Sequence, residues 1–283
     1  MRARVAAGML VGLVAAGLGF CAYIYASNER LLQRAYPVAP VSFVAAGGPD
    51  AVQRGKALAD ITGCTDCHRE TLQGGAFGEP DWLHGYYYAS NLTRKAQGYS
   101  DADLDRIVRQ GVRPDGHGVI AMPSFGFVRL TDAERADIIA FVRSVPVGGI
   151  DQPAHAIGPI DHWHLWREHF KPTVAYVAPE RLKSPPDAGE VHEAGRHVVA
   201  IVCVECHGGD LTGHGWDGDA PDLRVVLAYD APMFTRLLRT GTGADGREHG
   251  LMSMIARERL HKLSDEQIAA VFAYLTARAK LLQ

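Results

Sequence analysis

One five-residue pattern, Cys-x-x-Cys-His, occurs twice and constrains the fold of this chain more than any other feature. The copies cover residues 64–68 and 203–207, and their first cysteines lie 139 residues apart. Two thiols three positions apart lie on one helical turn, with the histidine beside the second thiol. The copies use four of the five cysteines, and only Cys21 lies outside them. Each copy therefore predicts a site around which its own small unit is built.

The spacing of the pattern is typical of covalent haem attachment. The two thiols reach the two vinyl groups of one porphyrin, and the histidine then projects over the iron. A zinc site would need a further cysteine or histidine pair nearby, and a thioredoxin-like site would need a strand–helix–strand pattern. We therefore expect two covalently bound haem c groups, each with its iron. The expected haem-binding residues in the motifs are Cys64, Cys67, His68, Cys203, Cys206 and His207.

Methionine is the expected sixth ligand of each iron, because a thioether paired with histidine gives electron-transfer sites of raised potential. Met122 is the candidate in the first unit, where Pro123 favours the extended backbone of a ligand loop. In the second unit Met252 stands eleven residues after a glycine, as Met122 does, whereas Met254 and Met233 are alternatives. A second histidine is the other alternative, and the candidates are His84, His117, His214 and His249.

The similarity between the two halves extends beyond the motifs. Residues 130–145 match residues 263–278 without a gap, and both segments begin with a capping box and continue with apolar residues at helical spacing. The glycine-rich turns 111–116 and 241–246 also correspond. A repeat at this spacing is a duplicated domain rather than a solenoid. We therefore expect an all-α fold of two tandem domains, each with a few helices, long loops and no large sheet.

The N-terminal residues 5–26 carry no charged side chain. A helix of these 22 residues would be about 33 Å long, enough to cross a hydrocarbon core that is about 30 Å thick. Arg2 and Arg4 place the N-terminus on the cytoplasmic side, and Tyr23 and Tyr25 occupy the opposite interface. We expect an uncleaved transmembrane helix. A cleaved signal peptide is the alternative, although its apolar stretch normally has only about 7–15 residues.

Proline and glycine clusters mark the segments between these units. The segment after the transmembrane helix is expected to be a tether that lets the domains move near the membrane. The connector between the domains should contain one short amphipathic helix, whose Trp163 and Trp166 mark either a docking surface or the seam between the domains. The expected boundaries are an anchor over 1–27, a tether over 28–49, domain 1 over 50–147, the connector over 148–186 and domain 2 over 187–283.

These features make the chain similar to the class I c-type cytochromes, and specifically to membrane-anchored dihaem members with two tandem cytochrome c domains. The first unit resembles the cytochrome subunits of membrane-bound alcohol and sugar dehydrogenases in Cys-Thr-Asp-Cys-His and in Ala-Met-Pro-Ser-Phe (121–125). The second unit resembles dihaem cytochromes in Gly-Leu-Met-Ser (250–253) before a long final helix, which favours Met252. Those dehydrogenase subunits typically carry three haem motifs, whereas this chain has two.

Two kinds of supporting contact are expected at each motif. A ligating histidine normally donates its second ring N–H to a carbonyl, and the loop around Pro221 could supply it in the second unit, with Pro80 as the candidate in the first. The resemblance also implies that a glycine before each motif packs on an aromatic residue of the last helix. The implied pairs are Gly55 with Phe141 and Gly195 with Tyr274.

The chain is therefore expected to be a membrane-tethered dihaem cytochrome c. It would pass single electrons between a respiratory dehydrogenase or another donor and an oxidase or a soluble cytochrome, with its domains on the periplasmic side of a bacterial cytoplasmic membrane. Two closed His/Met sites favour an electron-transfer protein, or a subunit of an oxidoreductase complex, over an enzyme. The alternative is a dihaem peroxidase-like enzyme with one open haem. A net charge of −3 gives no basic field for nucleic acid.

Overall fold

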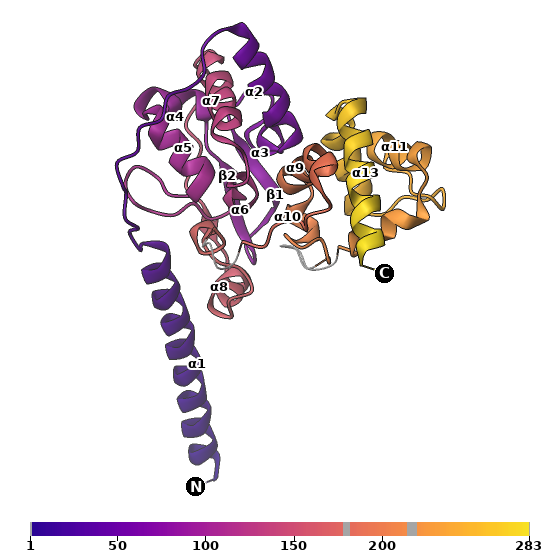
Figure 1. Ribbon diagram of the computed structural model, residues 1–283. Coiled ribbons are helices and arrows are strands. Elements are labelled where there is room, and N and C mark those ends of the chain that lie inside the picture. Colours follow the sequence, from indigo (N-terminus) through magenta and orange to yellow (C-terminus); the bar gives the residue numbers. More distant parts are fainter. Residues whose placement is uncertain (1, 178–181, 214–219, 283) are drawn as a thin grey trace.

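The computed structural model describes residues 2–177, 182–213 and 220–282 and is mostly helical (Figure 1). The first unit contains α2 (Pro49–Ile61), α3 (Cys64–His68), α4 (Leu92–Gly98), α5 (Asp101–Gln110), α6 (Ser124–Phe127) and α7 (Asp132–Ser144). The second unit contains α9 (Glu193–Val202), α10 (Val204–His207), α11 (Ala231–Thr240), α12 (Leu251–Glu258) and α13 (Asp265–Leu281), with the short 3-10 helices η3 (Glu190–His192), η4 (Leu223–Ala228) and η5 (Leu260–Lys262). The expected helical fold with two similar units is confirmed.

In each unit the helix before the motif crosses the last helix at a glycine. A Cβ added to Gly55 of α2 would lie only 1.9 Å from the carbonyl oxygen of Asp137 on α7. A Cβ added to Gly195 of α9 would lie 2.9 Å from the Cβ of Tyr274 on α13. The expected contact between Gly195 and Tyr274 is confirmed, whereas Gly55 meets α7 one turn before Phe141. Only glycine permits either crossing, because any side chain would strike the backbone of the partner helix.

Capping boxes begin the last helix of each unit, as the sequence predicts. At the start of α7 the Thr131 hydroxyl accepts from the backbone N–H of Glu134, and the Glu134 carboxylate accepts from the backbone N–H of Thr131. Ser264 and Gln267 make the same reciprocal pair at the start of α13. These bonds satisfy N–H groups that the first turn of a helix leaves without partners.

A small three-stranded sheet is inserted into the first unit. Strands β1 (Gly75–Asp81) and β2 (Gly85–Ala89) form an antiparallel hairpin between α3 and α4, and β3 (Ala156–Ile157) from the connector pairs with β2. The three consecutive tyrosines of β2, residues 86–88, favour a strand because aromatic side chains pack well on a pleated surface. The sheet binds the connector to the first unit, and the second unit has no counterpart of it among its described residues.

The expected flexible tether is instead bound along the first unit. Helix α1 (Arg2–Leu32) continues five residues beyond the expected end of the anchor. After it, the backbone N–H of Tyr36 donates to the carbonyl of Gly116 at 2.8 Å, and that of Ala46 donates to Ala136 at 3.1 Å. Phe43 packs on the apolar cluster between α5 and α7. The prediction of a freely moving linker was wrong, because its apolar residues and backbone groups find partners on the domain surface.

The connector contains the expected short helix, α8 (Pro159–Trp166), and a 3-10 helix, η1 (Thr173–Ala175). Helix α8 packs against the C-terminal half of α1 (Figure 1). The ring of Phe20 on α1 lies 6.4 Å from that of Trp163 and 5.4 Å from that of Trp166. Asn28 of α1 also donates to the carbonyl of His162 at 2.7 Å. Trp163 and Trp166 therefore do not lie at the seam between the two units.

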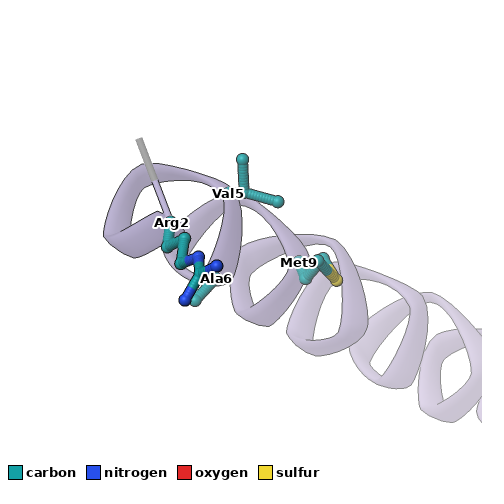
Figure 2. Close-up of a pocket in the computed structure, with 4 residues that line it drawn as sticks. All are labelled: Arg2, Val5, Ala6 and Met9. Atoms are coloured by element: carbon teal, nitrogen blue, oxygen red, sulfur yellow. The ribbon is translucent and has the colours of Figure 1, made fainter.

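Helix α1 is long and apolar enough to cross a membrane, and among the described residues no other helix is. None of its most apolar window is buried by the rest of the protein. At its free end Arg2, Val5, Ala6 and Met9 line a shallow hollow on the side of the helix (Figure 2). This hollow is part of the exposed surface of α1 and lies at the far end of the molecule from the two motifs (Figure 1).

The two units share one apolar core. Phe127 and Leu130 of the first unit belong to the same buried cluster as Val198 of the second, because α6 packs against α9 and α10. Beside this cluster, Nε2 of His197 on α9 lies 2.7 Å from Oε1 of Glu134 on α7. The two units therefore form one body with a common interior, and they are not two independent domains on a flexible string.

Candidate functional site

The two motifs form short helical turns, α3 and α10, directly after the glycine-bearing helices α2 and α9. Their first cysteines are partly buried, and loss of contact with water raises the pKa of the Cys64 thiol to about 11 and that of Cys203 to about 12. Burial also raises the pKa of Cys67. An S–H group is what adds across a vinyl group to form a thioether, so each cysteine can supply one such bond.

Both motif histidines are oriented by a backbone carbonyl. Nδ1 of His68 lies 2.8 Å from the carbonyl oxygen of Ser90, and Nδ1 of His207 lies 2.9 Å from that of Pro221. A carbonyl can only accept, so each Nδ1 carries the proton and the lone pair is on Nε2, the tautomer that binds a metal. The expectation for Pro221 is confirmed. The expectation for Pro80 was wrong, because the inserted hairpin places Ser90 beside His68.

The loop that contains Met122 in the first unit is held in place by hydrogen bonds, one of them from the connector. Met122 is partly buried against the shared core. Its carbonyl accepts from the Thr173 hydroxyl at 2.7 Å, and the buried Ser124 hydroxyl donates to Ile107 at 3.0 Å. Pro123 forms a tight turn with φ −81° and ψ 56°, in which the backbone N–H of Ser124 donates to the carbonyl of Met122 at 2.9 Å, and the chain becomes helical at Ser124.

Met252 has a different local structure in the second unit. It lies in the first turn of α12 and is partly buried against the shared core. Next to it, the buried Ser253 hydroxyl donates to the carbonyl of Gly241 at 2.5 Å, in a position similar to that of Ser124 in the first unit. Met254 and Met233 are more exposed, at 41% and 37%. Burial therefore favours Met252 among the three methionines.

The alternative histidine ligands that the structure describes are each paired with a nearby aspartate, at ring-nitrogen-to-oxygen distances of 2.7–3.3 Å. The pairs are His84 with Asp81, His117 with Asp115 and His249 with Asp245. His214 lies outside the described residues. The hydrogen bonds to aspartate favour structural roles in loops for His84 and His249 rather than ligand roles, whereas Nδ1 of His117 makes no hydrogen bond within the described residues.

A single arginine joins the two motifs. Arg259 follows α12, and its Nε lies 2.9 Å from Asp66 Oδ2 while its Nη1 lies 3.0 Å from Glu205 Oε2. Only 13% of its side chain is exposed. Although burial opposes it, the two carboxylates raise the pKa of Arg259. Gly63 leaves room for the guanidinium, since a Cβ there would lie 2.4 Å from Cζ of Arg259. The two motif turns therefore lie on either side of one buried positive charge.

Reasoning from the sequence did not identify Arg259. A signal for it was present, because Asp66 and Glu205 occupy the same place in the two motifs, directly before the second cysteine. Two carboxylates brought together by a duplicated fold repel each other unless a cation lies between them. The identity of that cation could not be deduced, since Arg259 is 193 residues from Asp66 in the sequence.

A second arginine supports the carbonyl that orients His207. Arg278 of α13 is buried, its Nη1 lies 3.3 Å from Asp222 Oδ1, and its Nη2 donates to the carbonyl of Asp210 at 2.8 Å. Asp222 directly follows Pro221. The last helix therefore holds in place the loop that presents Pro221 to the motif histidine.

The donor set at each motif fits a porphyrin better than a zinc ion. Within residues 2–177, 182–213 and 220–282, no three His, Cys, Asp or Glu side chains have the arrangement of a metal-ion site. A structural zinc ion needs four such ligands. Each motif instead offers two thiols and one oriented imidazole on a single turn, which suits two thioether bonds and one axial nitrogen.

Comparison with known proteins agrees with this geometry. The cytochrome c family profile matches residues 52–146 and again residues 192–278. The chain is also 25% identical over 280 residues to the fructose dehydrogenase cytochrome subunit of Gluconobacter japonicus, an alignment that covers 86% of this chain. The chain spans about half the length of that curated relative, 55% of it. Because the two family matches cover more than half of the chain and each contains one Cys-x-x-Cys-His turn, this protein belongs to the cytochrome c family, whose members transfer electrons through covalently bound haem c.

Proposed function

We propose that this chain is a membrane-anchored dihaem cytochrome c that passes single electrons between a dehydrogenase and an oxidase or a soluble cytochrome. The observation that carries the proposal is the pair of motif turns on either side of the Arg259 guanidinium. Each turn has its own histidine oriented by a carbonyl. Two similar sites held in one body suit the conduction of electrons rather than reaction with a substrate.

The same set of residue types is proposed to hold each haem. Haem bound in this way exchanges one electron at a time by a change in iron valence. The cysteines fix each porphyrin to its turn, the carbonyl bonds orient the imidazoles, and the methionines close the sixth positions against water. The proposed residues are Cys64, Cys67, His68 and Met122 in a domain over 50–147, and Cys203, Cys206, His207 and Met252 in a domain over 187–283.

The exposed α1 supports a membrane anchor. Its apolar side chains find no partner over most of its length, and contact with lipid would remove them from water. Arg2 and Arg4 precede the apolar run, which favours a cytoplasmic N-terminus. The two haem-binding units would then lie on the periplasmic side of a bacterial cytoplasmic membrane.

The relative that the chain matches supports a dehydrogenase as electron donor. That relative is named as the cytochrome subunit of a fructose dehydrogenase. The present chain has two haem motifs and spans 55% of that protein. We therefore propose a dehydrogenase as the class of donor and assign no substrate to it.

The decisive experiment uses the full-length protein purified from membranes. Intact mass and the pyridine haemochrome spectrum count the covalent haems, and the far-red charge-transfer band of methionine-bound ferric haem counts the closed sites. The proposal expects two haems, two methionine ligands and two one-electron potentials. One haem without the band, together with peroxide turnover, would replace the proposal with the peroxidase-like alternative.

A further inference from the structure

Three tryptophans lie on α8 or beside it. Trp163 and Trp166 belong to α8, and their rings contact the ring of Phe20. Trp82 lies at the turn of the β1–β2 hairpin, beside Leu83, whose carbonyl accepts a hydrogen bond from the first turn of α8. Trp163 is 41% exposed and Trp82 is 70% exposed. Large aromatic side chains that gather at one end of a protein mark a surface that something else covers.

The place of these rings along α1 matches the boundary of a bilayer. The charge-free run of α1 ends at Ala26, and Phe20 lies six residues before that end. Six residues correspond to about 9 Å along the helix axis. A helix that lies in a membrane interface buries its apolar face about 5–10 Å deep, where tryptophan and tyrosine are enriched. The α8 rings that contact Phe20 are therefore at the depth of an interfacial helix.

Helix α8 is bound to both α1 and the first unit. On one side, the buried Asn28 of α1 donates to the carbonyl of His162 at 2.7 Å. On the other, the hydroxyl of Tyr87 on β2 donates to Asp161 Oδ2 at 2.6 Å. Any force that the bilayer exerts on α8 is therefore transmitted to the sheet and to the unit that contains it.

The side chains of α8 suit the boundary between water and hydrocarbon. Leu165 is buried in the protein, whereas the exposed Arg167 directly after α8 lies with Cζ 5.8 Å from the centre of the Trp163 ring. An arginine beside a tryptophan can place its guanidinium among phosphates while the ring remains near acyl chains.

We propose that α8 lies in the periplasmic interface of the bilayer, with Trp163 and Trp166 among the lipid headgroups, and that it fixes the tilt of the whole protein. A single membrane-spanning helix can tilt by as much as about 40°. A second contact beside the point where the helix leaves the bilayer restricts that tilt. This inference rests on the proposed membrane anchor.

Lipid is the partner that we expect to cover the aromatic surface of α8, because this surface is continuous with that of α1. The aromatic surface of α8 is a direct extension of the side of α1 at Phe20. A bilayer that surrounds α1 must also meet any side chain at the same height beside it. A docked protein or a second copy would have to replace lipid at that height, and these are the occupants that the experiment must distinguish.

The test is photolabelling of the full-length holoprotein in nanodiscs. The discs contain phosphatidylcholine and phosphatidylglycerol with a small share of phosphatidylcholine that carries a diazirine near the carbonyl end of one acyl chain. Peptide mass spectrometry after illumination then locates the labels. We expect labels on residues 159–170 as well as on α1. Labels on α1 alone would overturn the inference about α8 but leave the anchor intact, whereas labels on neither segment would overturn both.

A variant tests the effect on tilt. Trp163→Glu should reduce labelling of residues 159–170 about ten-fold, since burial of one aromatic side chain contributes at least about 1.5 kcal/mol. Oriented multilayers examined by electron paramagnetic resonance should then show a broader spread of haem orientations. Val191→Glu is the matched control, because Val191 is exposed on η3 of the second unit. An orientation in Trp163→Glu as narrow as in the control would overturn the role in tilt.

Discussion

The two units have the same arrangement of helices but differ in the loops between the motif and the methionine. This contrast distinguishes the structural features that both haem sites keep from those that can vary. Both have a glycine crossing, a motif turn and a carbonyl on the histidine. The carbonyl comes from Ser90, 22 residues after His68, in the first unit, but from Pro221, 14 residues after His207, in the second. The helices are therefore kept in both units, whereas the loop in the first unit lengthens into a hairpin that pairs with the connector.

A second contrast concerns the methionines. Met122 lies on a loop whose backbone carbonyl accepts a hydrogen bond from Thr173 of the connector, whereas Met252 lies on a helix next to Ser253. The position of Met122 therefore depends on the connector, and the position of Met252 depends on its own unit.

The largest expected effect comes from removing one motif cysteine. Cys67→Ala and Cys206→Ala should each lose the covalent haem of one unit, which is half of the total, because a single thioether does not secure maturation of the site. Mass and the pyridine haemochrome spectrum measure this loss. Cys21→Ala is the control, since Cys21 is exposed on α1 and should leave the haem content unchanged. Full haem content in both motif variants, with the haemochrome band of a haem that keeps two thioethers, would show that these cysteines do not attach haem.

The next effect distinguishes the methionines. Met122→Ala and Met252→Ala should each remove about half of the far-red band and lower one potential by a clear part of the about 0.8 V range that axial ligands span. Spectroelectrochemical titration measures both quantities. Met254→Ala is the matched control on the same helix and should retain the full band. If Met254→Ala lost half of the band and Met252→Ala did not, the proposed ligand of the second unit would be wrong.

Arg259→Gln should destabilise both units together. The change leaves Asp66 and Glu205 facing each other without a cation, which costs about 3 kcal/mol in free energy of unfolding. Denaturant unfolding followed by circular dichroism measures this cost. Arg257→Gln is the control, because Arg257 is 44% exposed and pairs only with Glu248 at the surface. Equal stability in the two variants would show that the bridge between the motifs contributes nothing.

The smallest effect concerns pH and the contact between the units. The hydrogen bond to Glu134 raises the pKa of His197, and although burial opposes it, the bonds from His197 and Thr131 lower the pKa of Glu134. The raised pKa of His197 means that this ion pair stabilises the protein fully below about pH 6.5 and loses that contribution as the pH rises through the folded-state value.

His197→Gln should therefore cost about 1 kcal/mol near pH 6, and the cost should fall as the pH increases. Unfolding curves recorded at a series of pH values measure it. Glu134→Gln removes the same ion pair but can still cap α7, so it should show the same pH dependence. A constant difference at all pH values would argue against the ion pair.

The sequence predicted those features that depend on short patterns. The two motif turns and the two capping boxes were foreseen because each follows from neighbouring residues or from one repeated spacing, and the contact of Gly195 with Tyr274 was implied by the resemblance to the class I c-type cytochromes. The carbonyl of Ser90, the bridge by Arg259 and the course of residues 33–46 were not, because they depend on contacts between distant segments. The β1–β2 hairpin, with strands of seven and five residues, places the carbonyl of Ser90 rather than that of Pro80 beside His68.

The attachment of residues 33–46 to the first unit has a consequence for encounters between redox partners. With α1 in a bilayer, residues 33–46 form no flexible joint between the membrane span and the haem-binding units, so these units cannot swing away from the membrane to meet a distant partner. The protein then moves as one rigid unit, and only by lateral diffusion within the membrane. Electron exchange therefore requires partners that diffuse in the same membrane or arrive from solution. Its rate should depend on the concentration of these partners rather than on the length of the segment between α1 and the first unit.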